Sequence, residues 1–305
     1  VKANHEDKRP IGALLAVYAC LVVFWAVFHQ NGDALTVWAE DYTNREMPAS
    51  FEKASNTLGI SQTITYGEFV DYSNTSLKSH MDSLGALKQT YIDANDNVAS
   101  KAIAQRIKLE ESSIKYLSNL PKEKWPNQGQ DLKLVSTEIY QSVNPFWIIL
   151  LTPIVVGFFG FLRKRGKEPS TPSKIAIGLF ITALSALVMV GAVKATNLDS
   201  EKASSWWLIM TYAVITIGEL CLSPMGLSLV SKLSPPRITA LMMGGFFLST
   251  AVGNKLSGML SSLWEGFEDK SHFFLLNFVL ALAASLMMVF LLKWLKAVMR
   301  EKNIR

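Results

Sequence analysis

A single carboxylate inside a long apolar stretch is the clearest candidate for chemistry in this sequence. Glu219 has hydrophobic flanks on both sides, and an ionisable residue in a membrane span costs about 3 kcal/mol on insertion scales. Ser223 follows one helical turn later on the same face, and Pro224 removes a helical hydrogen bond and should bend the helix. A bent helix with an inward-facing carboxylate suits a substrate or proton site near the middle of a bilayer. A structural ion pair within a helix bundle is the plainer alternative.

Two other ionisable residues lie at the ends of apolar stretches. His29 follows Trp25 and Phe28, and histidine changes charge near neutral pH, which would suit proton coupling. Polar residues follow it at once, so a polar helix cap is the alternative. Lys255 lies toward one end of its apolar stretch, where we interpret it as an interfacial lysine rather than a gate. Cys20 and Cys221 lie inside apolar runs, which indicates neither a metal site nor a disulfide framework.

The elements that must position these residues are membrane-spanning helices. Half of the residues, 50%, are hydrophobic and 18% are charged, below the ~25% of a soluble domain. The apolar residues gather in runs of about twenty, the length that crosses a hydrocarbon core. The sequence predicts six spans, at residues 11–28, 145–162, 175–193, 206–230, 238–264 and 273–292. The helical pattern of the first span could continue to about residue 42.

The fifth span carries a stripe of small residues. Five of them recur every fourth position, at Gly245, Ser249, Gly253, Ser257 and Ser261. Such a stripe predicts close packing against another helix.

A polar segment of about a hundred residues separates the first two spans. We predict three regions: a first span with its cytoplasmic lead (1–44), an extracytoplasmic and mainly helical inserted domain (45–143), and five further spans with a cytoplasmic tail (144–305). Inside the insert, 77–95 and 98–117 have helical spacing, whereas 57–70 could hold a strand or two. His80 is predicted to be a solvated surface residue.

Lysine and arginine predict the orientation of the spans. One side of the predicted topology carries fifteen of them in its short segments, and the other side carries three. Both termini are therefore expected in the cytoplasm and residues 45–143 outside it. The net charge of +5 reflects these flanking residues, so we do not expect a nucleic-acid partner. Because the chain starts at Val1, we expect a fragment, a processed chain or one half of a larger protein.

Short motifs on four of the predicted spans occur in a recognisable order. Span four has Gly218-Glu219-Leu220, Ser223-Pro224-Met225-Gly226-Leu227-Ser228 and Lys232-Leu233-Ser234-Pro235. Span five has Met242-Met243-Gly244, Phe246-Phe247-Leu248 and Gly253-Asn254. Span one has Phe24-Trp25, Phe28 and Gln30, and span two starts at Asn144-Pro145. In this order they resemble helices ten, eleven, seven and eight of proton-dependent oligopeptide transporters, the POT or PTR family of the major facilitator superfamily. The insert falls outside the resemblance.

The resemblance implies a fold and a set of roles. The fold is an all-α membrane protein, of which this chain would be the C-terminal six-helix half. Glu219 would bind the amino terminus of a peptide and exchange a proton or pair with a lysine of the other half. Ser223, Asn144 and Pro145 would line the same site. Trp25, Phe28 and Phe246 would form side-chain pockets, and His29 would stand at the gating and proton-coupling position.

This sequence departs from the family pattern at two positions. The family often has tryptophan where Phe246 stands, so the apolar wall is kept but the indole donor is lost. Many members have a carboxylate where His29 stands, and histidine titrates with the opposite charge. The family's N-terminal motifs are absent, since they belong to the half that this chain lacks.

Three classes of function compete at this stage. The leading hypothesis is proton-coupled uptake of di- and tripeptides by alternating access in the inner or plasma membrane. The proton gradient would supply the energy without a cofactor, and this chain would be inactive alone. The second hypothesis is a non-transporting accessory or receptor protein whose outer domain binds a partner. An intramembrane enzyme is disfavoured, because the spans contain no zinc pattern, no paired aspartates and no serine with a nearby histidine.

Overall fold

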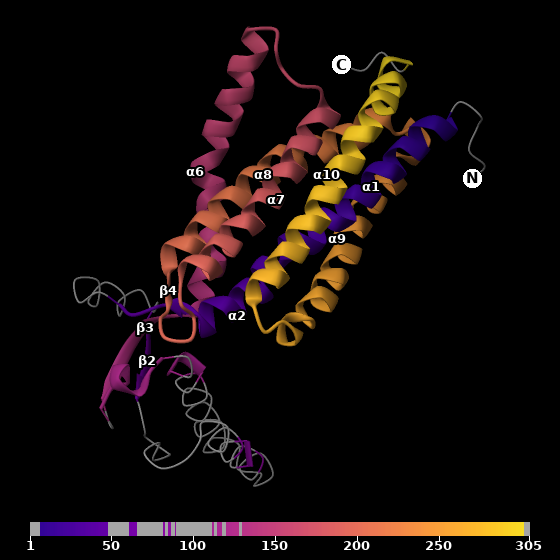
Figure 1. Cartoon of the computed structure of the whole chain (residues 1–305). Helices are drawn as coiled ribbons and strands as arrows, with labels where there is room; N and C mark the ends of the chain where they lie inside the picture. Colours follow the sequence, from indigo (N-terminus) through magenta and orange to yellow (C-terminus); the bar gives the residue numbers. More distant parts are fainter. Residues whose placement is uncertain are drawn as a thin grey trace, which may run out of the picture. The chain divides into compact units, whose positions relative to one another are not determined.

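A computed structural model describes residues 7–47, 61–65, 82, 85–86, 89, 112, 115–117, 120–127 and 130–301. Long helices dominate these residues (Figure 1). They are α1 (Lys8–Phe28), α6 (Thr137–Lys164), α7 (Thr171–Ala195), α8 (Ser205–Leu233), α9 (Thr239–Ser261) and α10 (Lys270–Glu301). Shorter elements are η2 (His29–Asn31), α2 (Ala34–Asp41), η4 (Lys122–Lys124), η5 (Pro236–Ile238), η6 (Trp264–Gly266) and strands β1 (Thr43–Asn44), β2 (Ser61–Thr65), β3 (Asp131–Val135) and β4 (Ala203–Ser204).

Within the described part of the chain, five stretches are long and apolar enough to cross a membrane. They are Lys8–Asp41, Thr137–Lys164, Thr171–Ala195, Ser205–Leu233 and Lys270–Glu301, and each contains one of the predicted spans. The predicted fifth span forms α9, a helix of 23 residues that is not among the five. Its many glycines and serines lower its hydropathy, so its crossing of the membrane stays a prediction.

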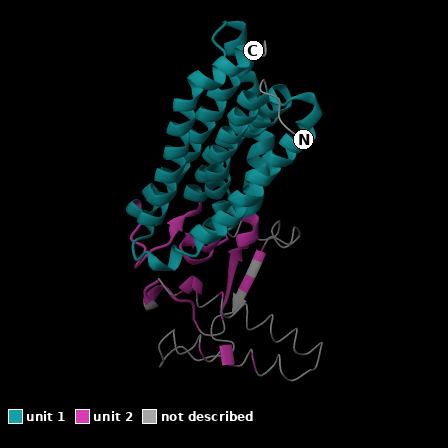
Figure 2. Cartoon of the chain, turned by 90° about the vertical axis from the view of Figure 1, so that its right-hand side faces the viewer, with its two compact units in different colours: residues 1–35, 141–194, 206–305 teal, residues 36–140, 195–205 magenta. Residues whose placement is uncertain are grey.

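The chain divides into two compact units (Figure 2). The first consists of residues 1–35, 141–194 and 206–305, and the second of residues 36–140 and 195–205. The second unit overlaps the predicted insert, but it also takes in residues 36–44 and the loop that joins α7 to α8. Most of the predicted insert helices and His80 lie outside the described residues.

The first predicted span does not continue as one regular helix. α1 ends at Phe28, and a short 3₁₀ turn precedes α2. The backbone N–H groups of Gly32 and Asp33 donate to the carbonyls of His29 and Gln30. Polar side chains compete with helical hydrogen bonds in such a stretch, which explains the interruption.

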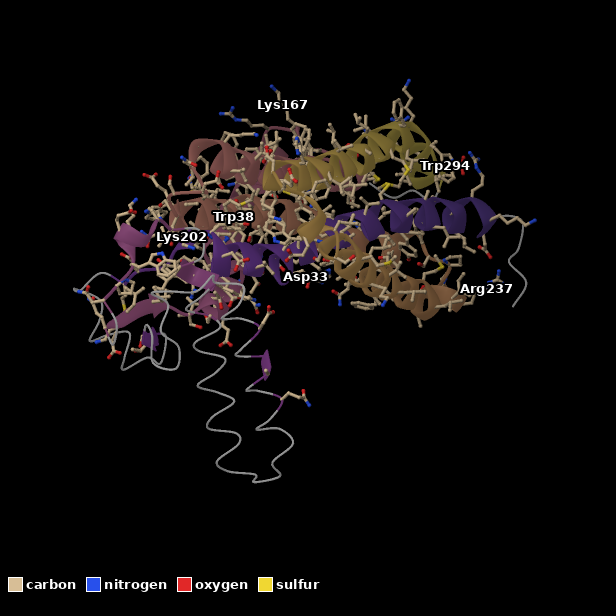
Figure 3. All side chains as sticks on the ribbon, turned by 60° about the horizontal axis from the view of Figure 1, so that its bottom comes forward. Asp33, Trp38, Lys167, Lys202, Arg237 and Trp294 are labelled. Atoms are coloured by element: carbon tan, nitrogen blue, oxygen red, sulfur yellow. The ribbon has the colours of Figure 1, made fainter. Side chains whose placement is uncertain are left out.

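The small-residue stripe of α9 packs on α1, as predicted. Within the first unit, α1 lies between α9 and α10 (Figure 1). Ser249, Gly253 and Ser257 are buried. A Cβ atom built on Gly253 would lie 2.4 Å from Trp25 Cβ and 2.8 Å from the Val22 carbonyl oxygen. Only glycine allows this approach. On the other side of α1, Trp294 of α10 (labelled in Figure 3) lies next to Gly12.

A second close approach joins α7 to α8. A Cβ atom on Gly178 would lie 2.7 Å from the Gly218 carbonyl oxygen, and one on Gly218 would lie 2.4 Å from Thr182 Oγ1. These contacts fix α8 against α7 one residue before Glu219. The backbone that carries Glu219 is thereby placed against α7.

The second unit contains a small core of its own. β2 and β3 pair antiparallel, with Ser61 opposite Val135, and this confirms a strand within 57–70. Tyr116 is fully buried, with the Arg45 guanidinium 5.3 Å and the Lys202 ammonium 4.5 Å from the centre of its ring. Burial lowers the pKa of Lys202 to about 7. The side chains of Arg45 and Lys202 therefore both pack on one buried aromatic ring of this unit.

We expect Gly253→Ala to destabilise the first unit by about 1–3 kcal/mol, the usual cost of overpacking. The measurement is thermal unfolding of the chain in detergent, followed by circular dichroism. Gly258→Ala is the matched control on the same helix, because a Cβ atom there meets nothing within 4 Å. Equal unfolding temperatures for the two variants would contradict the α1–α9 packing described above.

Candidate functional site

Glu219 lies next to a polar side chain of another helix. Asn144 Nδ2, on α6, donates to Glu219 Oε2 at 3.4 Å and to Thr216 Oγ1 at 3.0 Å. Thr216 Oγ1 in turn donates to the Tyr212 carbonyl at 2.6 Å. Asn144 is buried, whereas Glu219 is part-exposed. The structure therefore brings together two predicted site residues that are 75 positions apart in the sequence.

The residues after Glu219 continue the same helix. α8 runs through Pro224 without a break, and the predicted bend there stays a prediction. Ser223 lies one turn beyond Glu219, and its Oγ atom is buried without a hydrogen-bond partner among the described residues. A buried hydroxyl without a partner is costly, so Ser223 is suited to bonding a ligand. Pro145, beside Asn144 on α6, is exposed.

Three of the predicted residues form an aromatic group at the end of α1. The ring of Trp25 lies 5.4 Å from those of Phe28 and His29, centre to centre. His29 Nδ1 lies 2.8 Å from the Trp25 carbonyl oxygen. A carbonyl can only accept, so Nδ1 carries the proton and neutral His29 keeps Nε2 as an acceptor. Trp25 Nε1 is buried without a hydrogen-bond partner among the described residues.

Phe246 belongs to the packed core of the first unit. It is 3% exposed and meets Tyr18 edge-on at 6.4 Å between ring centres. Its ring also fills the space that a Cβ atom on Gly226 would need, 2.7 Å away. Phe246 thus extends from α9 and packs against α1 and α8. Its role in a pocket for peptide side chains stays a prediction. Lys255 is exposed on α9, in keeping with the interfacial interpretation.

A polar chain at the junction of η2 and α9 was not predicted from the sequence. Gln30 Nε2 donates to Ser257 Oγ at 2.9 Å, and Ser257 Oγ donates to Asp33 Oδ2 at 2.7 Å. Ser261 Oγ donates to Gln30 Oε1 at 3.0 Å. Figure 3 labels Asp33 at this end of α1. The four-residue spacing of Ser257 and Ser261 is the available signal in the sequence, and it predicts helix packing without predicting these hydrogen bonds.

Among the described residues, no three histidine, cysteine, aspartate or glutamate side chains gather as metal ligands would. The groups next to the Glu219 carboxylate are one amide and two hydroxyls, from Asn144, Thr216 and Ser223, and the aromatic group lies apart from them in sequence, at the end of α1. Such groups bind polar organic molecules and protons.

The sequence profile of the POT family matches residues 130–275. The matched region covers just under half of the chain. It includes α6, α7, α8 and α9, and hence Asn144, Glu219 and Ser223. Dipeptide and tripeptide permease A of Proteus mirabilis is 36% identical over 135 residues, which are 44% of this chain and 27% of the permease. The di-/tripeptide transporter of Lactococcus lactis is 33% identical over 156 residues, 50% of this chain and 30% of that transporter. Members of this family are transporters rather than enzymes.

Solved structures share the fold. A crystal structure of a peptide transporter POT in complex with sulfate aligns with a TM-score of 0.63 at 20% identity, over 97% of this chain and 42% of that chain. At this identity the likeness establishes the fold, an α-helical membrane protein. The chain spans less than half the length of the curated relatives and solved structures that it matches.

Proposed function

We propose that this chain forms the C-terminal wall of a transporter that takes up di- and tripeptides together with protons by alternating access. The single observation that carries the proposal is the contact between Asn144 and Glu219 across α6 and α8. It places an amide and a carboxylate side by side within apolar helices, where polar groups are kept for a function. The names of the similar permeases supply the substrate class.

The roles proposed for the residues follow from their chemistry. The carboxylate of Glu219 would bind the ammonium group of a peptide, and Asn144 and Ser223 would hydrogen-bond the peptide backbone near it. Trp25 and Phe28 would contact apolar peptide side chains. A proton on Glu219 removes its charge, weakens the hold on an ammonium group and so biases the equilibrium between the two transporter states.

The proposal requires a second half. A substrate cavity of this fold lies between two six-helix halves, so the other half must supply the facing wall. α6 leaves large apolar residues exposed, among them Phe146, Ile149 and Ile154. None of the relatives described above is named as an accessory or receptor protein, and nothing favours that alternative.

The first test is uptake of a dipeptide into liposomes that contain this chain assembled with its N-terminal half. With an inward proton gradient, we expect uptake by the wild type and loss of gradient-driven uptake in Glu219→Gln, because the variant keeps the shape of the side chain but neither its charge nor its proton. His29→Gln in the same assay tests the second coupling candidate.

Glu265→Gln is the matched control for this test, since Glu265 is exposed in η6. Unimpaired uptake in Glu219→Gln would remove Glu219 from the mechanism. An assembled and folded wild type that takes up no peptide under any gradient would overturn the proposed function itself.

We further propose that both chain termini and the loop between α6 and α7 lie in the cytoplasm, and that residues 45–143 lie outside it. The support is the excess of lysine and arginine on one side of the predicted spans. In a variant without Cys20 and Cys221, Lys167→Cys should react with a membrane-impermeant maleimide only after the cells are opened. Glu123→Cys, in the second unit, should react in intact cells. The reverse pattern would invert the topology.

A further inference from the structure

A basic cavity lies at the end of the first unit opposite η2. It has a volume of about 520 Å³ and is lined by the end of α6, the loop after it, the start of α7 and the end of α8. Arg163, Lys174 and Lys232 face it, with Glu168 as the only acidic residue of its lining. The lining therefore carries an excess of positive charge. None of the peptide-site residues described above belongs to it.

The cavity is a built site rather than a gathering of loose lysines. α6 ends in a turn in which Gly166 has φ of +68° and Lys167 N–H donates to the Leu162 carbonyl at 3.0 Å. This turn reverses the chain and returns Glu168 to Arg163, while the side chain of Lys167 points away from the bundle (Figure 3). Lys174 is buried, with 5% of its surface exposed. Its ammonium lies 4.6 Å from the centre of the Phe159 ring.

Glu168 organises the cations without using up their donors. It accepts from Arg163 Nε at 2.7 Å, from Arg163 Nη2 at 3.0 Å and from Lys174 Nζ at 2.5 Å. The hydrogen bonds from Arg163 and then from Lys174 lower the pKa of Glu168 to about 2, so it stays charged at neutral pH. A guanidinium has five N–H donors and an ammonium has three, so both cations keep donors for a further acceptor. Lys232 is exposed and adds a third cation.

We propose that this cavity binds a phosphate group, either the headgroup of an anionic phospholipid or a soluble phosphate. Arginine and lysine donors arranged around one opening match the several oxygens of a phosphate. Hydroxyls of Ser170, Thr171 and Ser228 in the lining offer further donors. Basic pockets between membrane helices at the lysine- and arginine-rich side are where anionic headgroups bind.

The apolar surface next to the cavity fits the phospholipid source. Phe158 and Phe161 of α6 are 56% and 49% exposed, just before the basic end of the helix. A lipid whose phosphate occupies the cavity would lay its acyl chains along this surface. The proposal does not depend on peptide transport, and its test needs no transport activity.

The test compares Lys232→Gln with Lys296→Gln. Lys232→Gln removes one cation of the cavity and leaves the Arg163–Glu168–Lys174 network intact. Lys296→Gln is the matched control, because it removes an exposed lysine of α10 at the same basic side of the predicted topology. In one arm, the full chain is placed in nanodiscs that contain equal amounts of phosphatidylcholine and phosphatidylglycerol. The protein is then released from the nanodiscs, and native mass spectrometry counts the lipid molecules that it retains. In the other arm, its unfolding temperature in neutral detergent is measured with inorganic phosphate or with chloride at equal ionic strength.

We expect phosphatidylglycerol to be retained in preference to phosphatidylcholine, and about fivefold less by Lys232→Gln than by the wild type or Lys296→Gln. That result supports a phospholipid headgroup. A phosphate-specific rise in unfolding temperature that Lys232→Gln abolishes supports a soluble phosphate. Absence of both effects, or equal effects of the two substitutions, would overturn the proposal.

Discussion

The contact between Glu219 and Asn144 is the interaction on which the candidate site depends. A carboxylate in an apolar helix is costly unless a polar neighbour or water stabilises it. α6 supplies this neighbour through an amide that also bonds Thr216. The Asn144 amide thus links the Glu219 side chain to the Thr216 hydroxyl, which in turn donates to the backbone of α8. The helices must keep these groups in register for the site to exist.

Small residues provide that register. Gly178 and Gly218 let α7 and α8 approach until a Cβ atom would overlap the facing backbone. Gly253 does the same for α9 against α1. Without water as a driving force between helices, close van der Waals packing of this kind is what holds a membrane bundle together. The polar chain of Gln30, Ser257 and Asp33 then closes one end of the α1–α9 interface.

The sequence was sufficient to predict the long helices and the packing stripe. Hydrocarbon thickness sets the length of an apolar run, and for this reason α7 and α8 extend only a few residues beyond the predicted 175–193 and 206–230. The buried faces of these helices could not be predicted, because a helix that is apolar on all sides shows no hydrophobic periodicity. Phe246 illustrates this, since only the structure places it between Tyr18 and Gly226. For His29 the sequence left proton coupling and a polar helix cap open. The bonds of the following polar residues to α9 could not be predicted, because they join positions more than 220 residues apart.

The central claim is that Glu219 recognises the amino terminus of a peptide. The most direct measurement is the affinity of the assembled transporter for a dipeptide with a free amino group and for its N-acetylated form, in the wild type and in Glu219→Gln. The account predicts that the substitution weakens binding of the free dipeptide by about tenfold or more, as expected for loss of a charged hydrogen bond. The affinity for the acetylated form should stay unchanged. Equal losses for both peptides, or no loss for either, would contradict the account.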